Sequence, residues 1–167
     1  MTVEEALVSA LDFEHRVRDH YARAAERTTD KNANRIFVSL AIEEQIHVDY
    51  LKTALTNWKN NNILDIKALR TSLPDKEWIN LGWEKLSKVD LKTDFKNELE
   101  MLRGALSLES AVSDHYAKLV ENLDGDIQKM FYKFLEMEEY HLAIIGMVVD
   151  SIERDNTLLE IPSKKSD

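Results

Sequence analysis

Two short motifs of the same composition, Glu44-x-x-His47 and Glu138-x-x-His141, are the first candidates for chemistry in this sequence. Residues i and i+3 of an α-helix lie on one face, about 4.5 Å apart along its axis, so each motif can direct a carboxylate and an imidazole into one small volume. Oxygen and nitrogen donors of these kinds bind iron, manganese and zinc. One such motif arises easily by chance, but two copies in matching register predict a shared metal site.

Two further glutamates, Glu14 and Glu109, lie in a duplicated part of the sequence. Aligning residues 11–26 with 106–121 at an offset of 95 gives eight identities in sixteen positions, and the Glu-x-x-His motifs repeat at an offset of 94. Each of these two glutamates occupies the middle of an otherwise apolar helical stripe. Two helical hairpins related by a pseudo-two-fold axis would therefore bring all four glutamates to one level.

A tyrosine follows each of the duplicated glutamates by two helical turns, as Tyr21 and Tyr116. Helical side chains lean toward the N-terminus, so each hydroxyl can reach a carboxylate on a neighbouring helix and support it as a metal ligand. The alternative interpretation is that both tyrosines are ordinary core aromatics.

Four long segments with apolar residues at alternating steps of three and four must position these side chains. They cover about residues 3–27, 31–59, 94–121 and 126–154. Thr2 and Glu5 have the spacing of a capping box before the first segment, and three consecutive asparagines follow the second. With only four glycines and two prolines, the chain lacks the turn residues of a sandwich or barrel. The prediction is an all-α, antiparallel four-helix bundle.

A long connection over about residues 60–93 joins the two hairpins. Its length allows the chain to return along the bundle, which makes the second and third helices parallel. Trp78 and Trp83 are predicted to anchor it to the helices. We therefore expect one domain over residues 1–153, followed by a flexible tail over 154–167.

Composition limits the classes of protein to consider. The chain has 167 residues, 44% of them hydrophobic, which fits a single domain with one core. Its net charge of −9 disfavours nucleic acid and anionic membrane surfaces as partners. The absence of cysteine excludes disulfides and thiolate metal sites. A start without the features of a signal peptide, and the lack of a membrane-length apolar run, predict a cytoplasmic protein.

Four converging carboxylates in an apolar core require cations, because burying an isolated carboxylate is costly and no lysine or arginine lies on the inward stripes. Four carboxylates and two imidazoles suffice for two metal ions. The donor set favours iron or manganese, with zinc as a further candidate. A Glu from each of two helices, with Glu-x-x-His from each of the other two, is the donor pattern of di-iron and di-manganese carboxylate bundles.

Other polar residues near the stripes receive simpler interpretations. His15, His20 and His115 are predicted to flank the core or face solvent rather than to bind metal. Glu43 and Glu139 lie beside the stripes, and are expected either to be surface charges or to support a ligand from outside the metal site.

The ligand pattern, the two tyrosines and the long crossover together resemble the rubrerythrin branch of the ferritin-like superfamily, over nearly all of residues 1–153. The resemblance implies terminal iron ligands at Glu14 and Glu109, bridging carboxylates at Glu44 and Glu138, and imidazole ligands at His47 and His141. The implied activity is the reduction of hydrogen peroxide or dioxygen at a reduced centre of two iron ions.

The sequence departs from that family at two points. It has no cysteine for the rubredoxin domain that usually delivers electrons, so the resemblance implies an external electron-donor protein. The glutamate that usually follows the third-helix ligand by one turn is Val112 here. Two other functions stay open: ferroxidase and iron storage of ferritin type, and a metal-free helical interaction module. Because no clear fifth helix follows the fourth, a homodimer is expected rather than a cage.

Overall fold

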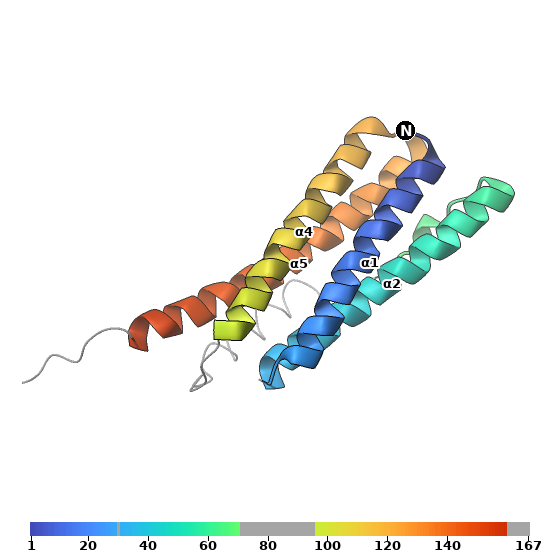
Figure 1. Cartoon of the computed structure of the whole chain (residues 1–167). Helices are drawn as coiled ribbons and strands as arrows, with labels where there is room; N and C mark the ends of the chain where they lie inside the picture. The colour runs from blue at the N-terminus through green and yellow to red at the C-terminus, as the bar shows by residue number, and fades with distance from the viewer. Residues whose placement is uncertain (30, 71–95, 160–167) are drawn as a thin grey trace, which may run out of the picture.

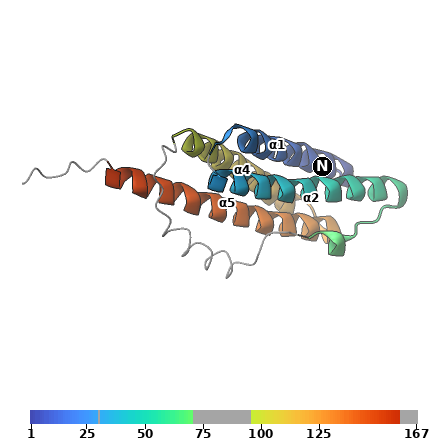
Figure 2. The same cartoon turned by 90° about the horizontal axis from the view of Figure 1, so that it is seen from below.

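The computed structural model describes residues 1–29, 31–70 and 96–159. It contains four long helices and a short 3₁₀ helix: α1 (Val3–Arg27), α2 (Lys31–Asn61), η1 (Ile66–Ala68), α4 (Lys96–Asn122) and α5 (Gly125–Leu159). The four long helices lie side by side as a bundle (Figures 1 and 2). No strand occurs in the described ranges, and the predicted all-α four-helix bundle is confirmed.

Contacts along the first hairpin show that α1 and α2 are antiparallel. The Nζ atom of Lys59 lies 2.9 Å from a carboxylate oxygen of Glu4, whereas the side chain of Asn34 donates a 2.7 Å hydrogen bond to the carbonyl of Ala25. The second hairpin is built in the same way. Arg103 donates to Glu153 near the open end, and Gln128 donates to the carbonyl of Val120 near the turn.

Two contacts between the hairpins fix the direction of α4. The Nε2 atom of His20 lies 3.3 Å from the carbonyl oxygen of Met101, and the Nε2 atom of His115 lies 3.1 Å from the hydroxyl of Ser9. Later residues of α1 thus face earlier residues of α4, so these helices are antiparallel and α2 runs parallel to α4. This parallel arrangement is the one that the predicted crossover requires, and residues 71–95 of that crossover, including Trp78 and Trp83, lie outside the described residues.

The ends of the first two helices follow from local hydrogen bonds. The Thr2 hydroxyl accepts from the Glu5 amide at 3.2 Å, and the Glu5 carboxylate accepts from the Thr2 amide at 2.7 Å, which completes the predicted capping box. Helix α2 ends two residues beyond its predicted end, at Asn61. Asn62 then takes a left-handed conformation, with a φ of 55°, and its amide donates to the carbonyl of Trp58 at 2.9 Å.

The fourth helix is longer than predicted. The sequence pattern placed its end at Arg154 and a flexible tail from 154 onward, whereas α5 continues to Leu159. Residues 155–159 contain no glycine or proline, so no helix-breaking residue stops α5 at Arg154. In both views the C-terminal end of α5 extends past the other helices (Figures 1 and 2). The rest of the predicted tail, 160–167, lies outside the described residues.

The apolar stripes of the four helices form one core between them. The steps of three and four expected in the fourth segment would bury Val148, three residues after Ile145, but Val149 is buried there and Val148 is only partly buried. A straight helix has 3.6 residues per turn, so it drifts away from a strict seven-residue pattern over several turns. None of the helices in the described ranges carries an apolar stretch that could cross a membrane.

Candidate metal centre

The structure brings the six predicted ligands together in the core between the four helices. Helices α1 and α4 each contribute one glutamate, and α2 and α5 each contribute a glutamate and a histidine one turn apart. All six side chains have an exposed fraction of 0%: Glu14, Glu44, His47, Glu109, Glu138 and His141. The cluster is therefore closed to bulk water.

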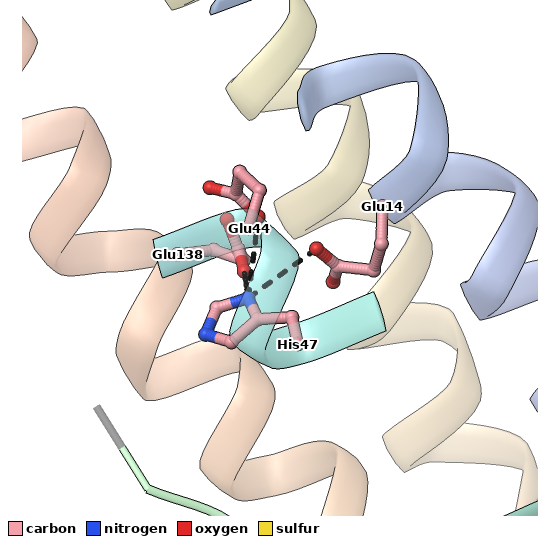
Figure 3. Close-up of side chains that lie close together, drawn as sticks. All are labelled: Glu14, Glu44, His47 and Glu138. Atoms are coloured by element: carbon pink, nitrogen blue, oxygen red, sulfur yellow. Dashed lines mark hydrogen bonds and ion pairs between the residues drawn. The ribbon is translucent and has the colours of Figure 1, made fainter. Parts of the chain in front are cut away.

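His47 faces three carboxylates from three different helices. Its Nδ1 atom lies 3.2 Å from Glu44 Oε2, 3.3 Å from Glu14 Oε2 and 3.4 Å from Glu138 Oε1. Figure 3 shows these contacts converging on one ring nitrogen. One ligand atom from each of these four residues lies within 4.8 Å of the others, a spacing that allows them to hold one metal ion.

His141 has the equivalent arrangement in the second half of the cluster. Its Nδ1 atom lies 2.9 Å from Glu44 Oε1, 3.0 Å from Glu138 Oε2 and 3.5 Å from Glu109 Oε1. Glu44 and Glu138 thus belong to both groups of four ligands. They lie between two candidate metal positions, one beside His47 and one beside His141.

Burial and neighbouring charges divide the four carboxyls into two pairs. Burial, reinforced by the charge of Glu138, raises the pKa values of Glu14 and Glu109 well above their ordinary value. Burial also opposes ionisation of Glu44 and Glu138, but the adjacent His141 and His47 outweigh it and lower the pKa values of both. The central pair is ionised and the outer pair favours the protonated form.

The two histidines complete this charge balance. Burial alone would lower the pKa of His47 and of His141, but the carboxylates facing each ring raise both values well above the ordinary one. In the metal-free protein, two imidazolium groups therefore balance the two central carboxylates. Two divalent ions would balance four carboxylates in the same way, after the outer glutamates and the histidines have lost their protons.

The two predicted tyrosines hold the outer glutamates across the boundary between the hairpins. Tyr21 of α1 donates a hydrogen bond to Glu109 of α4, and Tyr116 of α4 donates to Glu14 of α1. Burial and the nearby carboxylates raise the pKa values of both phenols well above their ordinary value. Both hydroxyls thus keep the proton with which they orient a candidate ligand.

The cluster contains buried acceptor atoms that a cation would satisfy. Four carboxylate oxygens have no hydrogen bond of good geometry among the described residues: both oxygens of Glu44, Oε2 of Glu109 and Oε1 of Glu138. Three of them, those of Glu44 and Glu138, nevertheless lie within 3.4 Å of a histidine Nδ1. Leaving such atoms unsatisfied in an apolar core is unfavourable. The residues therefore fit a metal, and an oxygen and nitrogen donor set without sulfur suits iron or manganese.

The other histidines lie outside this cluster. His20 and His115 contact α4 and α1 as described above, and the His115 ring also stacks on Phe13 with centroids 4.4 Å apart. His15 is partly exposed, and Glu139, which follows Glu138 in α5, is exposed.

Glu43 is the residue whose position the sequence pattern left least defined. Its side chain is fully buried, which excludes a surface charge, and its Oε1 atom lies 3.8 Å from His47 Nε2. The apolar stripe predicted from alternating steps of three and four residues passes through Glu44, one residue later in the sequence. A signal was nevertheless present, because Glu43 follows Leu40 by three residues and precedes His47 by four, so all three share a helical face.

A comparison with protein families matches residues 3–151 to the ferritin-like domain. The match covers most of the chain, which therefore belongs to the ferritin-like family. A bundle with a buried Glu and His cluster is compatible with the di-iron site of such a domain. Comparisons with curated proteins and with solved structures gave no match.

Proposed function

We propose that this chain is a non-haem di-iron carboxylate protein of rubrerythrin type that reduces hydrogen peroxide or dioxygen. The observation that supports it is the pair of ligand groups, which share Glu44 and Glu138 and are closed to water. The oxygen-rich donor set supports iron, with manganese as the nearest chemical alternative and zinc less suited to it.

The side chains have distinct tasks in this proposal. Glu14 and Glu109 would each hold one metal as terminal ligands, Glu44 and Glu138 would be shared between the two metals, and His47 and His141 would donate through Nδ1. When bound, the two irons supply two electrons, which with two protons convert one hydrogen peroxide to two waters. Tyr21 and Tyr116 keep the terminal carboxylates in place through their hydrogen bonds. The apolar core around the ligands excludes bulk water.

The proposal includes a separate electron donor. These 167 residues contain no cysteine with which to hold an iron–sulfur centre, and in this proposal the electrons come from a partner protein. It also includes a homodimer. Analytical ultracentrifugation of the metal-loaded protein tests the dimer, and a cage-sized particle would contradict it.

A second candidate function is the oxidation of ferrous iron as a substrate. The observation that favours it is Val112, which is fully buried one turn after Glu109. A rubrerythrin usually has another carboxylate there, and a valine cannot bind metal. With a valine at this position, the site has only the six ligands described above, and six such ligands are also sufficient for a site that oxidises iron for storage.

The test is anaerobic loading with ferrous iron, followed by separate pulses of peroxide and dioxygen while near-ultraviolet absorption is recorded. We expect about two irons per chain, and faster oxidation by peroxide than by dioxygen. Glu44→Ala should abolish stoichiometric loading, whereas the exposed Glu139→Ala should leave it unchanged. Faster oxidation by dioxygen with accumulation of ferric iron would favour the ferroxidase. A wild-type chain that binds no metal would instead favour a helical interaction module.

A further inference from the structure

We propose that Glu43 is a positioning residue that holds the distal nitrogen of His47, and that it makes the two metal positions unequal. The metal position beside His47 is then the first to fill. This inference rests on the proposed di-metal site. The six ligands are arranged almost symmetrically and give no reason for one position to fill first, whereas Glu43 does.

The contact that carries it lies on the outer side of the His47 ring. Its Nδ1 atom faces the three carboxylates of the cluster, and Nε2 points away from them (Figure 3). The Oε1 atom of Glu43 lies 3.8 Å from this Nε2, and both side chains are fully buried. A shortening of about 1 Å, within the reach of side-chain torsions, turns the contact into a hydrogen bond.

Metal binding demands such a partner. When Nδ1 binds a metal, the imidazole proton resides on Nε2, and a carboxylate that accepts it fixes the ring and makes Nδ1 a better donor. Loss of such a partner typically weakens metal binding about 10- to 100-fold. Glu43 is one turn before His47 on the same helix, so the two are held together by α2 itself.

The second half of the duplication lacks this carboxylate. The offset of 94 that relates His47 to His141 relates Glu43 to Met137. Met137 is partly buried, and a thioether is only a weak acceptor. Among the described residues, neither Nε2 atom has a hydrogen-bond partner, but the Glu43 carboxylate lies 3.8 Å from His47 Nε2, whereas the ion pairs of His141 are made through Nδ1. The two imidazole ligands are therefore supported unequally.

The test is a titration of the metal-free protein with Co²⁺, a divalent probe with a visible spectrum, followed by calorimetry and absorption. We expect two binding events in the wild type, the first at least about tenfold tighter. Glu43→Gln should weaken the first event about 10- to 100-fold, so that the two merge. Met137→Glu should tighten the second. Glu139→Gln, which removes an exposed charge next to Glu138, should change neither.

A spectroscopic measurement separates a hydrogen bond from a general effect of charge. In the Zn²⁺-loaded protein, the Nε2 proton of His47 should give a downfield, slowly exchanging NMR signal that moves upfield in Glu43→Gln, while the His141 signal stays in place. If Glu43→Gln does not fold, as judged by circular dichroism, Met137→Glu alone decides. A two-step wild-type titration that neither variant alters would overturn this inference and leave the proposed function standing. A wild type that binds no divalent metal would overturn the proposed function itself.

Discussion

Tyr21 on α1 donates a hydrogen bond to Glu109 on α4, so a candidate ligand of one hairpin is held by a side chain of the other. The reciprocal bond from Tyr116 to Glu14 repeats this relationship. The two hairpins are thus joined through the cluster itself as well as through the apolar core.

Replacing Tyr21 with Phe tests this connection. The change leaves the ring but removes the donor, so Glu109 loses its partner in a buried site. We expect the metal-free protein to lose about 1–3 kcal/mol of unfolding free energy in urea. The exposed Tyr132→Phe is the matched control and should stay within about 0.5 kcal/mol of wild type. Equal effects of the two changes would contradict a stabilising role for the bond.

The stability of the metal-free protein should fall as the pH rises. Burial and facing carboxylates raise the pKa values of four groups, Glu14, Glu109, His47 and His141. Their stabilisation is complete below the ordinary values, 4.5 for Glu and 6.5 for His, and is lost as the pH rises through the raised values. Glu44 and Glu138, with lowered pKa values, contribute stability that is lost only as the pH falls below 4.5.

Urea unfolding with a chelator present is the measurement for this prediction. The free energy of unfolding should be lower at about pH 9 than at about pH 6.5. The metal-loaded protein should show no comparable loss, because metal replaces the protons. A metal-free protein that becomes more stable across this interval would show that the buried histidines are not charged.

Metal uptake should release protons. The outer glutamates favour the protonated form and the histidines the charged form, whereas all six ligands must be deprotonated to bind metal. Two divalent ions should therefore displace up to about four protons, and affinity should weaken as the pH falls. Calorimetric titrations in buffers with different ionisation enthalpies give the number directly. Uptake without proton release would contradict the assigned charge states.

Replacing Val112 with Glu adds a carboxylate one turn after Glu109, in a fully buried position. Without metal, the new group has no cation to pair with, so we expect a loss of about 2–5 kcal/mol of unfolding free energy. With metal bound, part of this loss should be recovered, because the carboxylate gains a ligand role. Urea unfolding of the variant and the wild type, with and without metal, measures both the loss of unfolding free energy and its partial recovery. Val112→Gln, equally long but uncharged, separates the charge from the change in volume.

Much of the fold and of the site was predictable because both depend on helical periodicity. The spacing of Glu44 and His47, repeated as Glu138 and His141, places two donors on one face whatever the exact packing. The burial of Glu43 was harder to predict from the sequence, because this residue lies one position away from the apolar stripe that contains Glu44. Only the packing of the bundle covers it. Sequence also indicated that each tyrosine reaches a neighbouring helix, but the crossed pairing depends on the antiparallel contact of α1 with α4.

The division of the ligands between the hairpins has a consequence for how such a chain can arise. The first hairpin alone carries Glu14, Glu44 and His47, which is half of the set, and the contacts between hairpins are reciprocal. Two separate copies of one hairpin, paired about a two-fold axis, would present all six donors. Such a pair would stay associated only at sufficient protein concentration and metal supply. Joining them in one polypeptide replaces that bimolecular step with an intramolecular one of high effective concentration. Once joined, the halves are free to diverge, and Glu43 opposite Met137 is a difference that two identical copies could not have had.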